Sequence, residues 1–173
     1  MIKNEKETPL TLKERMQQAL ETSRGFTERL LADFDTPDQW LTTGVEGGNH
    51  PLWIAGHLAV ADNAFVNLVS ADRSQPRESY RKWFGKGSRP LHAIDEYDAP
   101  PEILEYMRER RSTLLNVLAD MPEERFNTPL PENSPKIMHD FGSVFHMAAW
   151  HEALHAGQLT VIRRCLGLGP VNG

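Results

Sequence analysis

The segment from 51 to 71 constrains the fold more than any other part of the chain, because it is apolar on almost every side. Asn49-His50-Pro51 is typical of a helix start, since proline is tolerated in the first helical turn and biases the preceding residue away from helix. Small or apolar residues then fill most positions: Leu52, Trp53, Ala55, Gly56, Ala59, Val60, Ala64, Phe65 and Leu68. A helix that is apolar all round has to be covered by its neighbours. The segment therefore predicts a central, buried helix that ends near Ala71.

Three other segments carry apolar residues at helical spacing. The first covers about 11–34 and opens with Thr11-Leu12-Lys13-Glu14, which has the spacing of a capping box. Another covers about 101–121. The last begins near 136 or 140 and ends at Leu166, before a glycine stop signal. The sequence contains no convincing strand pattern and no internal repeat, which favours an all-α fold.

The connections between these helices differ strongly in length. We expect 35–48 to be a loop, whereas 73–101 is a long polar crossover between the second and third helices. A crossover of this length lets those two helices run in the same direction, so we predict an up-down-down-up four-helix bundle. Tyr80, Trp83 and Phe84 predict that the crossover folds back on the body. We expect a single domain over 1–173 with a flexible N-terminus at 1–10.

Composition and charge exclude several classes of protein. The chain of 173 residues is 39% hydrophobic and 25% charged, as in globular domains, and its net charge of −5 gives no reason to expect nucleic-acid binding. No apolar run approaches the roughly 18 residues of a membrane span, and the polar start lacks a signal peptide. One cysteine, Cys165, rules out an internal disulfide and fits a reducing compartment. We therefore expect a cytoplasmic protein with no membrane partner.

Two histidines share one face of the last helix. His151 and His155 are four residues apart, so on a helix they point within about 40° of each other. Gln158 continues that line at the next turn. Neutral imidazoles suit a divalent first-row ion such as zinc or nickel, and an active site typically adds a third protein ligand and an open position. The spacing thus supplies two ligands of a metal site.

A third ligand has to come from another helix. His57 is the best candidate, because it lies in the middle of the buried helix. His50 sits at a helix end, and His92 lies in the crossover. His139 lies too far from His151 along the last helix, and His146 points about 140° away from His151. A His-x-x-x-His pair alone is a modest signal. The competing interpretation is that all these histidines are polar core residues without a metal.

The other polar groups near this stripe have two interpretations each. Gln158 either contacts a metal-bound water or a ligand's second shell, or bridges two helices as an amide. Glu152 lies roughly 100° around the helix from His151, so the zincin motif is absent and we expect a solvated or interhelical salt-bridge residue rather than a general base. We expect Cys165 to be a buried small hydrophobe. Trp53 and Trp150 are interpreted as bundle core that flanks the histidines.

These motifs together resemble the DinB-like family, which includes YfiT-type proteins described as metal-dependent hydrolases. The matching runs are Trp53-Ile54-Ala55-Gly56-His57-Leu58-Ala59, Trp83-Phe84-Gly85-Lys86-Gly87-Ser88 and His151-Glu152-Ala153-Leu154-His155-Ala156-Gly157-Gln158-Leu159. The resemblance implies an up-down-down-up four-helix bundle with His57, His151 and His155 as a three-histidine metal site. It also implies chemistry that in some members uses a low-molecular-weight thiol.

Two functional hypotheses follow. In the first, the protein is a metal-dependent transferase or hydrolase that activates a thiol or water for attack on a small molecule, with Gln158 behind the metal ligands. The lack of an obvious carboxylate base near the histidines favours the thiol. In the second, the metal only joins two helices of a non-catalytic binding module, and a fourth protein ligand such as His50 would favour this alternative. A homodimer is the assembly that we consider.

Overall fold

The computed structural model describes residues 9–171, and all regular elements there are helical. The α-helices are α1 (Leu12–Leu31), α2 (Pro37–Leu41), α3 (Pro51–Val69), α4 (Glu78–Phe84), α5 (Pro100–Asp120) and α6 (Phe141–Cys165). Short 3₁₀ turns lie at Ala71–Arg73, Ile94–Glu96 and Glu123–Arg125. The predicted flexible N-terminus falls largely outside the described residues. The all-α prediction is confirmed.

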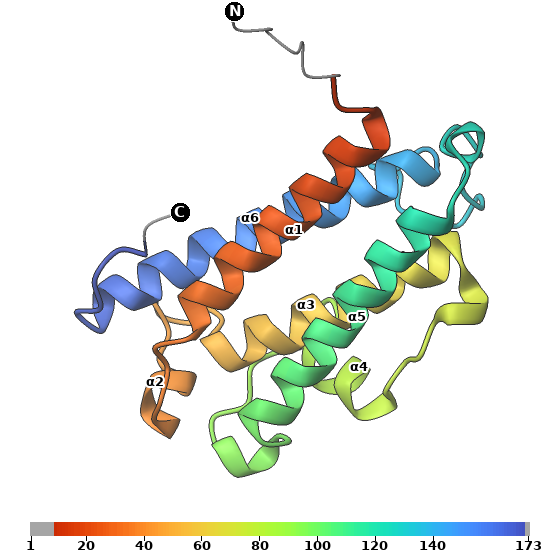
Figure 1. The fold of residues 1–173 in the computed structure, drawn as a ribbon. Helices are drawn as coiled ribbons and strands as arrows, with labels where there is room; N and C mark the ends of the chain where they lie inside the picture. The colour runs from red at the N-terminus through yellow and green to blue at the C-terminus, as the bar shows by residue number, and fades with distance from the viewer. Residues whose placement is uncertain (1–8, 172–173) are drawn as a thin grey trace, which may run out of the picture.

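The four long helices α1, α3, α5 and α6 form an up-down-down-up bundle (Figure 1). In Figure 1, α3 and α5 run in one direction, whereas α1 and α6 run in the other. Each helix packs on two others, in the order α1, α6, α3, α5 and back to α1. The long connection between α3 and α5 makes their parallel arrangement possible, as its length predicted.

Local sequence signals account for where the helices begin. Thr11 caps α1 through the predicted capping box with Glu14. Asp140 caps α6 by accepting a hydrogen bond from the Ser143 amide at 2.8 Å, which settles the start of this helix. The segment 35–48, expected to be a loop, contains α2. Its start is a second capping box, between Thr36 and Gln39, with a proline in the first turn.

The central helix α3 is buried along most of its length, as its composition predicted. Among residues 9–171, α3 is the one helix whose length and composition would allow it to cross a membrane, although Asp62 and Asn63 interrupt its apolar run. Of that stretch, 67% is buried inside the bundle. A core helix meets the same test of length and composition.

The core consists of two apolar clusters, one toward each end of the bundle. Each long helix contributes a buried charged residue, placed between the two clusters, to one network of ion pairs: Arg24, Asp62, Arg111 and Glu152. We call these four residues the charge layer. The layer divides the core at mid-height and contains one residue from each of the four helices.

The crossover folds back on the bundle through α4, as its aromatic residues predicted. Tyr80 and Phe84 are fully buried, and α4 packs on α3. Gly56 makes this approach possible, because a Cβ at that position would lie 2.5 Å from the Phe84 ring. The contact therefore brings the end of α4 against the part of α3 that carries His57.

Candidate metal centre

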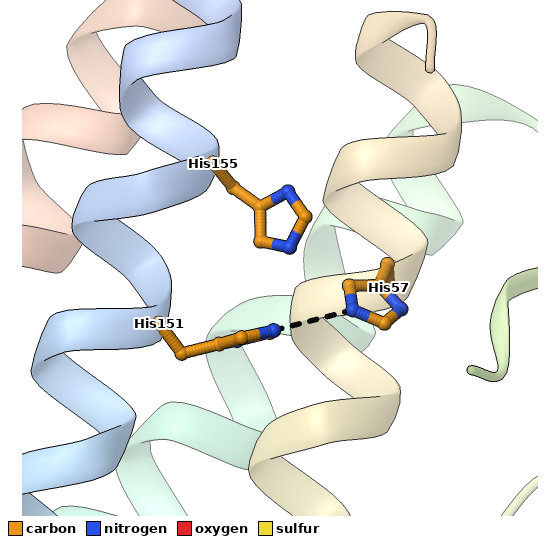
Figure 2. Close-up of side chains that lie close together, drawn as sticks. All are labelled: His57, His151 and His155. Carbon is orange, nitrogen blue, oxygen red and sulfur yellow. Dashed lines mark hydrogen bonds between the residues drawn. The ribbon is translucent and has the colours of Figure 1, made fainter. Parts of the chain in front are cut away.

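The structure brings His57, His151 and His155 together between α3 and α6. Figure 2 shows His57 reaching from α3 toward the other two rings, which come from successive turns of α6. One ligand nitrogen from each histidine lies within 4.8 Å of the others, and the Nε2 atoms of His57 and His151 are 3.3 Å apart. Three nitrogens at about 2.1 Å from one tetrahedral ion would lie about 3.4 Å apart. The cluster therefore has the dimensions of a three-histidine metal site.

Hydrogen bonds hold two of the rings in the orientation that a metal needs. His57 Nδ1 lies 2.7 Å from the carbonyl oxygen of Phe84. A carbonyl can only accept, so Nδ1 carries the proton and Nε2 keeps its lone pair. His155 Nδ1 lies 3.0 Å from Gln158 Oε1, and the same argument leaves its Nε2 free. In metal-binding histidines, the ring nitrogen that does not bind the metal typically donates a hydrogen bond to an acceptor of this kind.

Burial keeps the three imidazoles neutral. Burial, followed by the charges of His155 and His57, lowers the pKa of His151 to about 4. Burial, followed by the charge of His57, likewise lowers the pKa of His155 to about 4. The pKa of His57 is lowered by burial, which outweighs the bond to Phe84. At neutral pH all three rings therefore offer lone pairs, so the donor set fits a divalent ion.

The remaining histidines lie outside this cluster. His50 caps α3, where its Nδ1 accepts from the Trp53 amide at 3.0 Å and its Nε2 donates to Leu91 at 3.2 Å. His92, His139 and His146 are exposed. Within residues 9–171, no fourth histidine, cysteine or carboxylate joins the group. Three protein ligands with an open position are typical of catalytic rather than structural metal sites.

The two tryptophans expected to flank the histidines have different surroundings. Trp53 is buried and stacks on the His57 ring, with centroids 4.6 Å apart. Trp150 is 48% exposed, so its interpretation as bundle core is wrong. The reason is its direction, roughly 100° from His151 on the side opposite Glu152, which points into the bundle. Trp53 thus fixes a ligand ring, and Trp150 lies on the surface.

Cys165 is also exposed, contrary to the expectation that it is buried. It is the last residue of α6, and its Sγ lies 3.8 Å from the carbonyl oxygen of Gly44. At this point α6 faces the loop after α2 rather than a packed helix. Cys165 is therefore neither core nor part of the histidine cluster.

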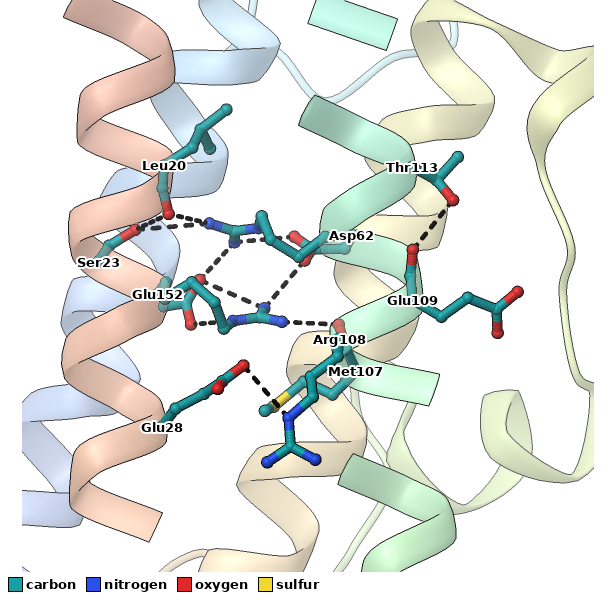
Figure 3. Close-up of polar contacts among 11 residues, drawn as sticks. Leu20, Ser23, Glu28, Asp62, Met107, Arg108, Glu109, Thr113 and Glu152 are labelled. Carbon is teal, nitrogen blue, oxygen red and sulfur yellow. Dashed lines mark hydrogen bonds and ion pairs between the residues drawn. The ribbon is translucent and has the colours of Figure 1, made fainter. Parts of the chain in front are cut away.

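Glu152 is an interhelical salt-bridge residue, which confirms one of its two interpretations and rules out a solvated one. Its side chain is fully buried in the charge layer (Figure 3). Arg24 Nε donates to Glu152 at 2.7 Å, and Arg24 Nη2 donates to Asp62 at 2.9 Å. Arg111 contacts both carboxylates, with 2.9 and 3.0 Å bonds to Asp62. Two positive and two negative groups thus neutralise one another inside the bundle.

Sequence reasoning missed the other three residues of the charge layer. Asp62 offered a signal, because an acidic residue in an otherwise apolar helix has to find a partner when it is buried. Arg24 and Arg111 offered none, since they lie on amphipathic helices that carry several other charges. Burial lowers the pKa of Arg111, but Asp62 and Glu152 outweigh this and raise it above its usual value. Arg111 therefore stays charged.

Comparison with known proteins agrees with this fold. The model of the DinB superfamily matches residues 19–159 of the chain. No curated protein matches the chain. YfiT from Bacillus subtilis, described as a probable metal-dependent hydrolase with an unusual four-helix bundle topology, is 16% identical with a TM-score of 0.66. The match covers 97% of this chain and 95% of that one. A conserved protein from Enterococcus faecalis is 14% identical with a TM-score of 0.68, over 92% and 99% of the two chains.

Proposed function

The chain belongs to the DinB superfamily, and we propose on this basis that it is a metal-dependent enzyme acting on a small molecule. The observation that carries the proposal is the convergence of three neutral imidazoles on one point, without a fourth protein ligand among residues 9–171. The description of YfiT as a probable metal-dependent hydrolase supports the same class of function. Zinc or nickel suits this donor set.

The residues of the site have distinct roles in this proposal. His57, His151 and His155 hold the ion through Nε2, and the Phe84 carbonyl and Gln158 fix the tautomers of two of them. When bound, the ion supplies a Lewis acid that lowers the pKa of a coordinated water or thiol toward neutrality. Trp53 stacks on His57 and shields one side of the site from solvent.

A thiol is the nucleophile that the surroundings favour. Water attack usually benefits from a nearby general base, but both carboxylates of the charge layer are engaged by arginines. Beside Gln158, a pocket of about 260 Å³ lies between the loop at 44–49 and α6, with Val161 and Ile162 in its wall. We propose this pocket as the place for the apolar part of the thiol or of its electrophile. A thiol-dependent transferase is thus our first choice, and a hydrolase the second.

A non-catalytic, metal-stabilised module is the alternative function. His50, the residue that would have favoured it as a fourth ligand, is engaged in capping α3 instead. We further propose a cytoplasmic protein that acts on small molecules, without nucleic-acid or membrane partners, and a homodimer as its assembly. Size-exclusion chromatography with light scattering tests the homodimer.

Metal analysis of protein purified without an affinity tag tests the proposal directly. We expect about one equivalent of zinc or nickel in the wild type and in His146→Ala, a control on the exposed side of α6. We expect none in His155→Ala. The metal-loaded protein is then assayed with several low-molecular-weight thiols and small electrophiles, and with ester and amide substrates. Turnover that persists in metal-free His155→Ala would contradict the proposal.

A further inference from the structure

A second polar pocket, of about 260 Å³, lies beside α3 and away from the histidine rings. Its walls come from α3, from the segment between α3 and α4, from α4 itself and from α5. The polar residues that line it are Asn63, Asn67, Ser74, Arg77, Arg81 and Tyr106. Among the residues that the structure describes, no acidic side chain lines the pocket. Two guanidinium groups thus share a concave surface on a protein with a net charge of −5.

The hydrogen-bonding groups of the pocket are mostly donors. Asn63 Oδ1 is already occupied, because it accepts from the Gln75 amide at 2.8 Å. Asn63 Nδ2 donates to Ser74 Oγ at 3.1 Å, so the Ser74 hydroxyl keeps its own proton for another acceptor. Arg77 and Arg81 can only donate. A group that complements this surface has to bring acceptor oxygens and negative charge.

Arg77 is held in place without an acidic partner. Its guanidinium carbon lies 4.3 Å from the centre of the Tyr106 ring and 5.1 Å from that of Tyr80. Stacking on aromatic rings fixes the plane of the guanidinium. Its Nη1 also donates to the Tyr80 hydroxyl at 3.4 Å, and its other N–H groups are available to a ligand. Within residues 9–171, Arg77 forms no ion pair. The nearby carboxylate of Asp98 interacts with the Tyr80 hydroxyl, and burial together with this carboxylate raises the pKa of Tyr80 to about 12. Arg77 is therefore preorganised for an anion.

The other two arginines add to the positive charge. In the described part of the chain, the one ion pair of Arg81 is with Glu78, at 3.6 Å and on the surface, where such pairs contribute little. Arg110 is 1% exposed, lies 5.5 Å from the centre of the Tyr106 ring, and donates to Asn63 Oδ1 at 3.4 Å. Its Nε is buried without a partner, and Glu109 is its one carboxylate partner in the described chain. A buried guanidinium thus lies next to the residues that line the pocket.

We propose that this pocket binds the anionic group, a carboxylate or phosphate, of a small molecule. Arg77 and Arg81 supply the charge-assisted hydrogen bonds, and Asn67 and Ser74 supply neutral donors. Ala64, which also lines the pocket, follows His57 by seven residues, nearly on the same face and about 10 Å along α3. A ligand of that length can place its anionic end here and its reacting group at the histidines. This last step rests on the proposed function, whereas anion binding itself does not.

Titration of the metal-free protein with inorganic phosphate and with succinate, at constant ionic strength, tests the site. Amide shifts in ¹H–¹⁵N correlation spectra report binding residue by residue. We expect saturable shifts at 63–67 and 74–81, and at least a fivefold weaker affinity in the double variant Arg77→Gln, Arg81→Gln. The matched control is Lys82→Gln, Lys86→Gln, which removes the same charge from exposed positions near α4 that do not line the pocket.

The outcomes separate a site from a general electrostatic effect. Retention of affinity in the lysine control, with loss in the arginine variant, supports the proposal. Equal weakening in both variants, or shifts that do not saturate with either probe, overturns it. Arg77→Lys adds a second criterion, because it keeps the charge but loses the planar fork, and we expect at least a threefold loss. Cobalt binding by the same variants, measured separately, tests the histidine site, so either proposal can fail alone.

Discussion

His151 and Glu152 are consecutive residues of α6 whose side chains belong to two different polar sites. His151 points toward α3 and joins the histidine cluster, whereas Glu152 points to the bundle axis and joins the charge layer. The charge layer holds Glu152 from two sides, through Arg24 on α1 and Arg111 on α5. The rotation of α6, and with it the direction of His151, is therefore set by ion pairs on the neighbouring face of the helix, about 100° away.

The first prediction concerns the free energy of unfolding of Glu152→Gln. The substitution keeps the shape of the side chain but leaves two buried arginines with one carboxylate, and breaking a buried ion pair costs about 3–5 kcal/mol. Urea denaturation should show a loss of this size. Glu28→Gln is the control, because Glu28 pairs with Arg108 at 3.5 Å near the surface, and we expect a loss of less than about 1 kcal/mol. Equal losses would contradict the role assigned to the layer.

The second prediction concerns Gly56→Ala. A Cβ at this position would lie 2.5 Å from the Phe84 ring, so α4 has to move and carry away the carbonyl that holds His57. Overpacking should cost about 1–3 kcal/mol of stability, and cobalt affinity should fall by about 10-fold or more. Gly157→Ala is the control, because a Cβ there meets nothing within 4 Å. We expect this control to be more stable by about 0.5–1 kcal/mol, with unchanged cobalt affinity.

A third prediction addresses Gln158. Gln158→Leu removes the acceptor that fixes the His155 tautomer, so cobalt affinity should fall by about 10- to 100-fold. Gln158→Glu restores an acceptor at the same distance and should recover most of the affinity. Isothermal titration of both variants measures the difference. If the two variants bind cobalt equally well, the hydrogen bond has no part in holding the ligand.

A fourth prediction concerns the pH dependence of stability through His50, which is remote from the metal ligands. Burial lowers the pKa of His50 in the folded protein to about 4, against about 6.5 when unfolded. The unfolded chain therefore binds more protons than the folded protein between these two pH values. The contribution of His50 to the free energy of unfolding is present above about pH 6.5 and is lost as the pH falls toward 4. From pH 7 to pH 5, His50 should account for a loss of about 2 kcal/mol.

The variant His50→Asn isolates this effect. Asparagine also caps helices well, so the bond from the Trp53 amide can be kept while the titrating group is removed. Urea unfolding of metal-free protein at pH 7 and pH 5 gives the comparison. His151 and His155 titrate over the same range in both proteins, so the variant should retain part of the acid sensitivity. An identical pH dependence in variant and wild type would show that His50 does not contribute.

The sequence predicted the features that depend on periodicity and spacing within one helix. The apolar helix at 51–69 and the His151–His155 pair are of this kind, and the length of the crossover was enough to predict the topology. Features that depend on which side of a helix faces the axis could not be predicted. Trp150 and Cys165 were therefore placed wrongly, and Arg24 and Arg111 were missed, because the rotation of a helix is set by contacts between helices.

The composition of the charge layer has a consequence for how the chain folds. Because Arg24, Asp62, Arg111 and Glu152 come from four different helices, any three-helix intermediate would bury one unbalanced charge. Such an intermediate pays a desolvation penalty that the complete bundle avoids, so partly assembled states are raised in energy relative to both the unfolded and the native chain. The layer thus favours two-state folding, in which the histidines of α3 and α6 come together in the same cooperative step that docks α1 and α5.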